Sequence, residues 1–230
     1  MNNDILTGKT KEHFIFDEAI NRYFHKDIYE DFLKLKARAK EDGFDLYVTS
    51  SFRGFDDQLR IWNEKAQGKR KLFNDNGEEL DFKKLREREV LDSILRWSAI
   101  PGASRHHWGT DLDVVDKLSW PKDYHVQLTP QEFSEGGPFH NFSLWLSRLI
   151  KEEKGLGFFR PYENDLGGVA PEMWHISHVK QSNKLMRSYT LDVFRNHIEE
   201  HIEEIALSDL LLENIDFYYE NYFTNIKQTF

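Results

Sequence analysis

Short strand-like segments, scattered between longer helical ones, limit the folds open to this chain. Apolar residues recur at helical spacing over residues 28–39, whereas 44–52 and 107–115 alternate in character as strands do. We expect two further short strands around 156–160 and 172–179. Few, short strands that do not alternate regularly with helices predict an α+β fold, with a small antiparallel sheet and flanking helices.

Helical and polar segments complete the chain. Residues 67–82 are polar and carry a turn signal at Asp75-Asn76-Gly77, which predicts a surface insertion. The aromatic residues between 217 and 223 are expected to pack against the rest of the chain or to form a dimer contact. Further helices are predicted from Asp56 or Asp57 to Ala66 and over residues 83–97, 139–152, 189–205 and 207–223.

The composition excludes several classes of function. Forty aspartates and glutamates outnumber 31 lysines and arginines, so the net charge is −9 and the basic footprint of a nucleic-acid-binding protein is missing. The chain has no cysteine, so a metal site would have to use His, Asp or Glu. No segment has the length and apolarity of a membrane span, and the first residues do not resemble a signal peptide. We therefore expect a cytoplasmic protein.

Side chains with metal-binding chemistry gather in two segments. The first contains His106 and Asp113, and the second contains Glu172 and His175. If their strands lie side by side, two imidazoles and a carboxylate would suit a catalytic zinc ion with one open position, and Glu172 could act on its water. Asp111 would either orient a ligand or compete as one, and we expect the first role because carboxylates commonly orient metal-bound histidines.

Three motifs occur in order between residues 50 and 178. They are Ser50-Ser51-Phe52-Arg53-Gly54 with Gln58 five residues after the arginine, Ser104-x-His106-x-x-Gly109-x-x-x-Asp113, and Glu172-x-Trp174-His175. Together they resemble the signature of the VanY-type D,D- and L,D-carboxypeptidases of the lysostaphin/D-Ala-D-Ala metallopeptidase/hedgehog (LAS) superfamily of zinc enzymes. The chain departs from the family pattern at Asp111, Met173 and Ser177-His178, where the family commonly has Ala, Pro and Arg-Tyr.

The resemblance implies a hedgehog/D-Ala-D-Ala peptidase-like fold. It implies a single zinc peptidase domain over 1–230, with a catalytic core of about 27–180 and a C-terminal helical extension of about 188–224. One zinc ion would polarise the scissile carbonyl and lower the pKa of its water toward about 7. The implied site residues are the zinc ligands His106, Asp113 and His175, the general base Glu172, the oxyanion-binding Arg53, and Arg53, Gln58 and Ser104 as substrate contacts.

The implied substrate is a peptidoglycan stem peptide that loses its C-terminal D-alanine. Because we expect a cytoplasmic protein, we favour an L,D-carboxypeptidase acting on tetrapeptides in murein recycling. The alternatives are a D,D-carboxypeptidase or dipeptidase acting on D-Ala-D-Ala ends, a phage-type L-Ala-D-Glu endopeptidase, and a peptidoglycan-binding module without activity. The presence of Glu172 beside all three ligands favours turnover. The oligomeric state and the third stem residue stay open.

A second metal-binding pattern lies near the C-terminus. His197-Ile198-Glu199-Glu200-His201 matches the H-x-x-E-H arrangement of another zinc class, with both imidazoles on one helical face. The segment is rich in glutamate, so we interpret it as a solvated acidic face and expect no metal there.

Overall fold

A four-stranded antiparallel sheet forms the centre of the molecule. The computed structural model describes residues 2–227, without the side chains of residues 153 and 154. The sheet has the strand order β3-β4-β6-β5, and a separate hairpin pairs β1 with β2. The predicted α+β fold is therefore confirmed. The strands are β1 (Phe14–Asp17), β2 (Arg22–His25), β3 (Leu46–Ser50), β4 (Asp111–Asp116), β5 (Phe158–Phe159) and β6 (His175–His178).

Helices surround the sheet, and none in the described part of the chain has the length and apolarity that crossing a membrane requires. The longer ones are α2 (Tyr29–Glu41), α3 (Phe55–Ala66), α4 (Glu87–Trp97), α6 (His140–Glu153), α7 (Val179–Ser188) and α8 (Leu191–Glu200). The shorter ones are α1 (Asn3–Leu6), α5 (Pro130–Phe133), α9 (Ser208–Glu213), α10 (Ile215–Tyr218), η1 (Lys26–Ile28), η2 (Phe82–Lys84), η3 (Arg105–Trp108), η4 (Lys154–Gly157) and η5 (Tyr219–Thr224).

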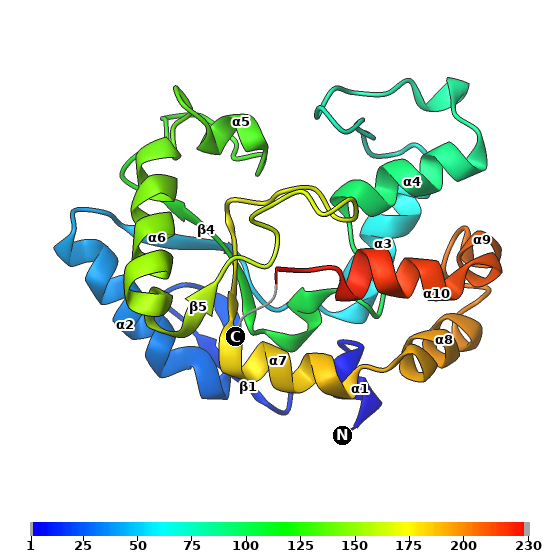
Figure 1. Ribbon diagram of the computed structural model, residues 1–230, viewed down its shortest axis with the longest axis horizontal. Coiled ribbons are helices and arrows are strands. Elements are labelled where there is room, and N and C mark those ends of the chain that lie inside the picture. The colour runs from blue at the N-terminus through cyan, green and yellow to red at the C-terminus, as the bar shows by residue number, and fades with distance from the viewer. Residues whose placement is uncertain (1, 228–230) are drawn as a thin grey trace.

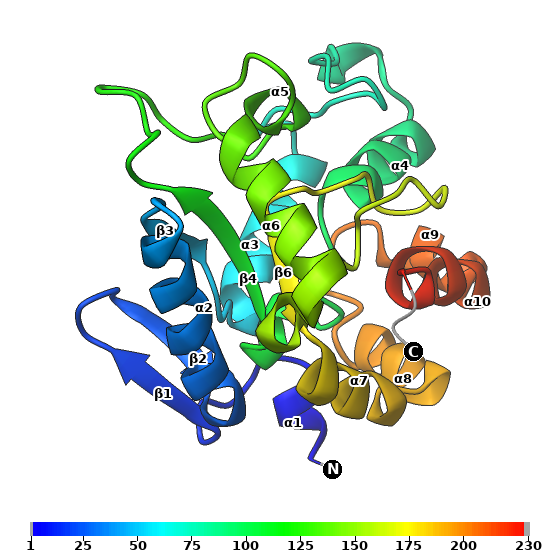
Figure 2. The same cartoon turned by 60° about the vertical axis from the view of Figure 1, so that its left-hand side comes forward.

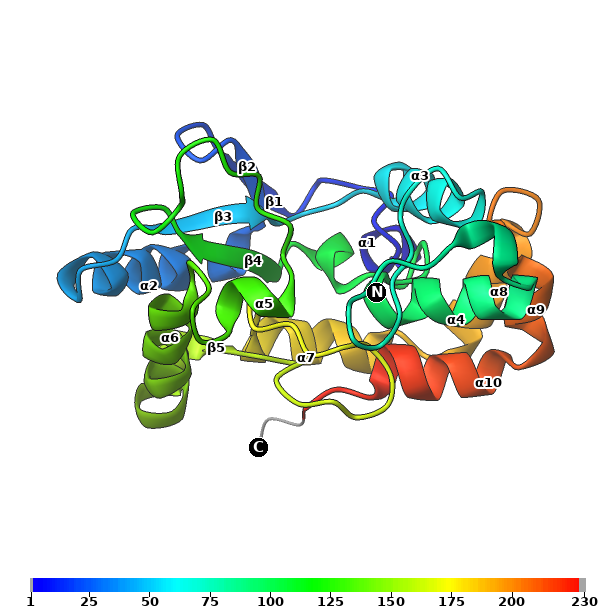
Figure 3. The same cartoon turned by 90° about the horizontal axis from the view of Figure 1, so that it is seen from above.

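The molecule has a sheet half and a helical half (Figure 1). In the sheet half, α2 and α6 pack beside the strands around a core that includes Phe32, Leu112 and Leu146. In the helical half, α3 and α4 share a second core with α8, α9 and α10, as the view from above also shows (Figure 3). The strands β4 and β6 lie between the two halves, so residues at their ends face the junction (Figure 2).

The C-terminal helices are joined to the core by buried contacts. Trp62 of α3 donates its indole N–H to the carbonyl of Ala206 over 2.8 Å, and the ring of Trp108 meets Phe223 edge-on. Tyr218 and Phe223 are buried in the same apolar cluster as Trp62. Most of the aromatic C-terminal segment thus packs against the rest of the chain, which is the first of the two expected arrangements.

Several element boundaries differ from the sequence prediction. Helix α3 begins at Phe55 with Gly54 at its N-cap, so Asp56 and Asp57 lie in its first turn, where negative charge favours the helix dipole, and do not cap it. Helix α4 begins four residues later than predicted, because Phe82–Lys84 forms a separate 3-10 turn. The last predicted helix is divided into α9, α10 and η5, and β6 begins only at His175.

Buried histidines make the stability of this fold sensitive to acid. His197 of α8 is 4% exposed and packs edge-on against Phe55. Burial, together with the nearby His201 and Lys9, lowers its pKa to about 3. The unfolded chain takes up a proton here near pH 6.5 and the folded chain does not, so stability falls as the pH decreases from about 6.5 toward 3.

We expect the His197→Gln variant to lose less stability on acidification than the wild type does. The difference should approach about 1.4 kcal/mol per pH unit below pH 6, the value for one proton. Urea unfolding at a series of pH values from 7 to 4.5 measures it. The exposed His125, replaced by glutamine, is the matched control and should keep the wild-type slope. Equal slopes in the wild type and the His197 variant would contradict the prediction.

Candidate active site

The register between β4 and β6 brings two of the predicted ligands together. Asp113 and His175 are directly paired residues of this antiparallel ladder, although 61 positions separate them in the sequence. Paired residues on one face of a sheet have their Cβ atoms about 5 Å apart, so both side chains can reach one point. On its other side, Asp113 pairs with Ser50 at the end of β3, three residues before Arg53.

The third predicted ligand, His106, comes from the 3-10 turn η3. Its Nδ1–H donates a 2.8 Å hydrogen bond to the carbonyl of Ser51, which leaves Nε2 facing the sheet. The turn ends at Gly109, whose φ of 62° is left-handed. A Cβ at this position would lie 2.5 Å from the ring of Phe14, so the glycine of the motif is required by both the backbone and its neighbour.

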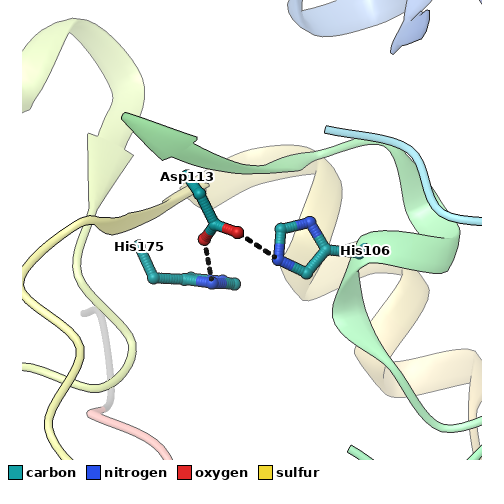
Figure 4. Close-up of side chains that lie close together, drawn as sticks. All are labelled: His106, Asp113 and His175. Carbon is teal, nitrogen blue, oxygen red and sulfur yellow. Dashed lines mark ion pairs between the residues drawn. The ribbon is translucent and has the colours of Figure 1, made fainter. Parts of the chain in front are cut away.

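The three side chains converge on one point (Figure 4). Nε2 of His106 lies 3.3 Å from Oδ2 of Asp113, and Nδ1 of His175 lies 3.2 Å from Oδ1 of Asp113. One ligand atom from each residue lies within 4.8 Å of the others. Tetrahedral ligands at 2.0–2.1 Å from a zinc ion stand about 3.3 Å apart, so these separations match such a site.

Hydrogen bonds fix the orientation of His175 from behind. Its Nε2 lies 3.0 Å from Oδ1 of Asp111, so Nε2 carries a hydrogen and Nδ1 is the ring nitrogen that faces Asp113. Asp111 is fully buried and also accepts a 2.7 Å hydrogen bond from Nε of Arg105. The second Arg105 contact, 2.7 Å to Ser177 Oγ, holds the guanidinium against β6. Asp111 therefore contacts the predicted ligand His175 on the side opposite Asp113, and does not lie among the three converging ligand atoms.

Two atoms of the cluster have no hydrogen-bond partner among the described residues. Oδ1 of Asp113 and Nδ1 of His175 are both buried and both lack a partner. Burial alone raises the pKa of Asp113, but the imidazoles of His106 and His175 bring it well below its ordinary value, so the carboxylate is charged. A carboxylate oxygen and an imidazole nitrogen that face each other without a hydrogen bond are suited to a divalent cation, which would replace the proton of the imidazole.

Glu172 stands at the open side of this group. Its carboxylate oxygen lies 3.4 Å from Nδ1 of His175, and its backbone N–H is anchored to the carbonyl of Tyr162. Burial raises the pKa of Glu172 to about 7, and the negative charge of Asp113 acts in the same direction against the cations nearby. A carboxylate with a pKa near neutrality can accept a proton and return it at physiological pH.

Arg53 is held close to the predicted ligands by the loop between β3 and α3. Its backbone N–H donates to the carbonyl of His106, and its own carbonyl accepts a 2.6 Å hydrogen bond from the ring of His107. Its guanidinium donates to Oε1 of Gln58 over 2.8 Å and to Ser50 Oγ over 3.2 Å. Gln58 is fully buried and donates its amide to the carbonyl of Ala99, so it fixes Arg53 and does not itself line the cleft.

A cleft of about 390 Å³ opens in front of these residues. Arg53, Ser104 and Glu172 line it together with the three predicted ligands, and residues of the 67–82 insertion form part of its wall. Lys65 and Tyr162 are among the lining residues that sequence reasoning missed. The ring of Tyr162 meets that of His175 edge-on, and Lys65 lies at the end of α3. Neither belongs to a recognisable motif, and only the tertiary fold brings them here.

The second histidine pattern also forms a cluster, but a lysine lies within it. Ligand atoms of His197, Glu200 and His201 lie within 4.8 Å of one another. The ammonium of Lys9 donates a 2.7 Å hydrogen bond to Nε2 of His201 and lies 3.9 Å from Glu200. The ammonium of Lys9 thus already supplies the positive charge that these residues would otherwise offer to a metal ion. The helix is not wholly solvated as predicted, because His197 is buried.

The fold and this site define a class of protein: an α+β peptidase with two histidines, one aspartate and a glutamate at the edge of a small sheet. Residues 21–181 match the model of the VanY family, described as D-alanyl-D-alanine carboxypeptidase. The chain belongs to this family, within the LAS zinc peptidase superfamily. Two uncharacterised proteins of Haemophilus influenzae are similar in sequence. One is 37% identical over 42% of this chain and 68% of its own length, and the other is 28% identical over 54% and 92%.

Solved structures share the fold. VanYB in complex with D-alanine-D-alanine has a TM-score of 0.52 and 19% identity, over 76% of this chain and 81% of its own. The LdcB LD-carboxypeptidase has a TM-score of 0.52 and 19% identity, over 79% and 75%. A mutant of the D,D-pentapeptidase VanY in complex with Zn(II) has a TM-score of 0.50 and 20% identity, over 75% and 82%. The equal TM-scores of VanYB and LdcB favour neither substrate preference.

Proposed function

We propose that this protein is a zinc-dependent carboxypeptidase that removes the C-terminal D-alanine from peptidoglycan stem peptides, with a preference for tetrapeptides. One observation supports the proposal above all: the buried, unpartnered Oδ1 of Asp113 and Nδ1 of His175 face each other beside Glu172. Such a ligand group, next to a proton acceptor in a cleft, is the arrangement that metal-assisted peptide hydrolysis needs.

The chain's own residues divide the work of hydrolysis. His106, Asp113 and His175 would hold the ion, which when bound polarises the scissile carbonyl and acidifies the attacking water. Glu172 would take the proton from that water and pass it to the leaving amino group, because its carboxylate stands beside the predicted ligands and lines the cleft.

Two side chains of the cleft would bind the substrate. The guanidinium of Arg53, oriented by Gln58, would stabilise the carbonyl oxygen as negative charge develops on it. Ser104, whose side chain lines the cleft, would bind the terminal carboxylate and so favour an exopeptidase. We assign Gln58 to positioning Arg53, since its own polar groups are already bonded.

The shape of the cleft supports a tetrapeptide substrate. An L,D-carboxypeptidase must accept a long L-amino acid side chain before the scissile bond, whereas a D,D-enzyme accepts the methyl group of D-alanine. Glu172, Lys65 and Phe73 of the 67–82 insertion all line the cleft, whose volume of about 390 Å³ is more room than a methyl group requires.

We expect purified protein with added zinc to release D-alanine from a stem tetrapeptide at least about tenfold faster, as kcat/KM, than from the matching pentapeptide. Chromatographic measurement of D-alanine from both peptides tests this, and a tetrapeptide ending in L-alanine is the control. Preference for the pentapeptide would contradict the L,D assignment. Cleavage of intact sacculi between L-Ala and D-Glu would identify an endopeptidase, and binding without release would identify a recognition module.

A further inference from the structure

Lys65 is a partly buried cation that the proposed chemistry does not use. It lies in the last turn of α3, and its ammonium donates a 2.6 Å hydrogen bond to Ser98 Oγ, just beyond the end of α4. Both side chains line the cleft. Among the residues that the structure describes, no carboxylate lies within ion-pair distance of this ammonium. Burial, followed by the charges of Arg70 and Arg53, lowers the pKa of Lys65 to about 8, so it is still charged at pH 7.

The other charged side chains of the cleft either form an ion pair or already have a role in the proposed mechanism. Arg105 is paired with Asp111, and Arg70 is paired with Glu64. The carboxylates that line the described cleft, those of Asp113 and Glu172, serve the ion and the proton transfer in the proposed mechanism. Among the described residues, Arg53 and Lys65 line the cleft as two cations that form no direct ion pair. Partly desolvated charges of this kind gain from an anionic partner, so the cleft is suited to a ligand with two negative charges.

We propose that Lys65 and Ser98 form a subsite for a second carboxylate of the substrate, separate from its C-terminal one. The proposal rests on the proposed function, in which Arg53 and Ser104 serve the end of the peptide that is cleaved. Lys65 would neutralise the second carboxylate. The oxygen of the Ser98 hydroxyl accepts from Lys65, so the hydrogen of that hydroxyl is left to donate to the same carboxylate. The substrate class is therefore a peptide dianion.

A stem peptide can supply this carboxylate from two places. One is the α-carboxylate of a γ-linked glutamate, and the other is the side-chain carboxylate of a diamino diacid in the third position. Both present the same chemistry to Lys65, and amidation removes the charge of either one while almost preserving its size. Matched acid and amide peptides can therefore identify which carboxylate is bound.

The test compares four tetrapeptides at pH 7 with the zinc-loaded enzyme. Two contain lysine in the third position, with the glutamate as acid or amide, and two contain diaminopimelate, with its side-chain carboxyl as acid or amide. We expect one acid to exceed its amide about tenfold or more in kcat/KM, the usual size of a hydrogen bond to a charged group. Lys65→Met should abolish that preference, so that the acid and the amide give equal kcat/KM. Lys65→Arg should keep the preference.

The control is Lys69→Met, which removes the same charge from an exposed position outside the cleft and should leave the preference unchanged. The charge of Lys65 also acts to lower the pKa of Glu172, so an effect through Glu172 must be distinguished from substrate binding. An effect through Glu172 alone would change kcat/KM by the same factor for the acid and the amide peptide, so the preference would remain, and it would shift the pH profile. This result would overturn the subsite. Absence of any acid preference in the wild type would also overturn it.

Calorimetric titration of the same peptides separates the two proposals. If no peptide loses D-alanine but the acid still binds more tightly than the amide in a Lys65-dependent way, the subsite stands and the proposed hydrolysis fails. If D-alanine is released from acid and amide at equal rates and both bind equally, the hydrolysis stands and the subsite fails.

Discussion

Replacing Glu172 with glutamine is expected to abolish hydrolysis while the metal content stays at the wild-type level. Glutamine preserves the size of the side chain and its backbone contact with Tyr162, but it can no longer accept a proton. General acid–base groups contribute about 10²–10⁴-fold, and we expect kcat to fall by that factor with little change in KM. Kinetics of D-alanine release, measured beside the zinc content of the same preparation, test this.

Glu163→Gln is the matched control for this variant. Glu163 lies in the same segment between β5 and β6 but forms an ion pair with Lys227 and does not line the cleft. Its replacement should leave kcat unchanged. If Glu172→Gln retains full activity, its assignment as the base is wrong. If the variant loses its metal together with its activity, Glu172 would instead be a ligand, which the 3.4 Å contact with His175 makes geometrically accessible.

The predicted ligand group could be found from sequence because local pattern determines its parts. Alternation along β4 places Asp111 and Asp113 on one face, and the motif around Glu172 indicates the strand that carries His175. What pattern alone does not determine is the register of β4 against β6, and therefore which residue faces Asp113. The family resemblance supplied that pairing, and the ladder has Asp113 opposite His175.

Residues that reach the cleft through tertiary packing could not be predicted in this way. Lys65 and Ser98 meet only because the end of α3 lies beside the end of α4, and no sequence spacing encodes that approach. Arg105 would be expected on a surface, yet it is 3% exposed because it neutralises Asp111. The chain has Ser177 where the family commonly has arginine, and Arg105 donates to that serine, so a guanidinium reaches this place from another segment.

The missed secondary structure has similar causes. The hairpin of β1 and β2 has only four residues in each strand, too few for a periodic signal, and its contact of His25 N–H with the carbonyl of Gly109 appears only in the folded chain. Helix α7 buries Gln181 and Ser182 beside Leu185, so its buried face is largely polar and the spacing of apolar residues does not reveal it. The break between α8 and α9 includes Leu207 with a φ of 64°. This left-handed backbone conformation is unusual for leucine, so the sequence gives no sign of it.

Removal of a ligand imidazole should eliminate the metal and the stability that it confers. We expect His106→Ala and His175→Ala to lose zinc affinity by more than the 10–100-fold typical of residues that only contact a ligand, and to lose D-alanine release with it. A zinc ion held by these ligands would stabilise the folded chain over the unfolded one, so adding zinc should raise the Tm of the wild type and not that of either variant, a readout independent of activity. Elemental analysis should find one zinc per wild-type chain and much less in both variants.

His201→Gln is the control for this experiment and decides between the two histidine clusters. Its ring is bonded to Lys9 and Glu204, so we expect the variant to keep one zinc per chain, the zinc-dependent rise in Tm and the wild-type rate. Two zinc ions in the wild type and one in His201→Gln would show that an ion displaces Lys9 from the second cluster. Full zinc content in His106→Ala, with loss in His201→Gln, would move the metal site to α8 and would remove the basis for hydrolysis at the sheet edge.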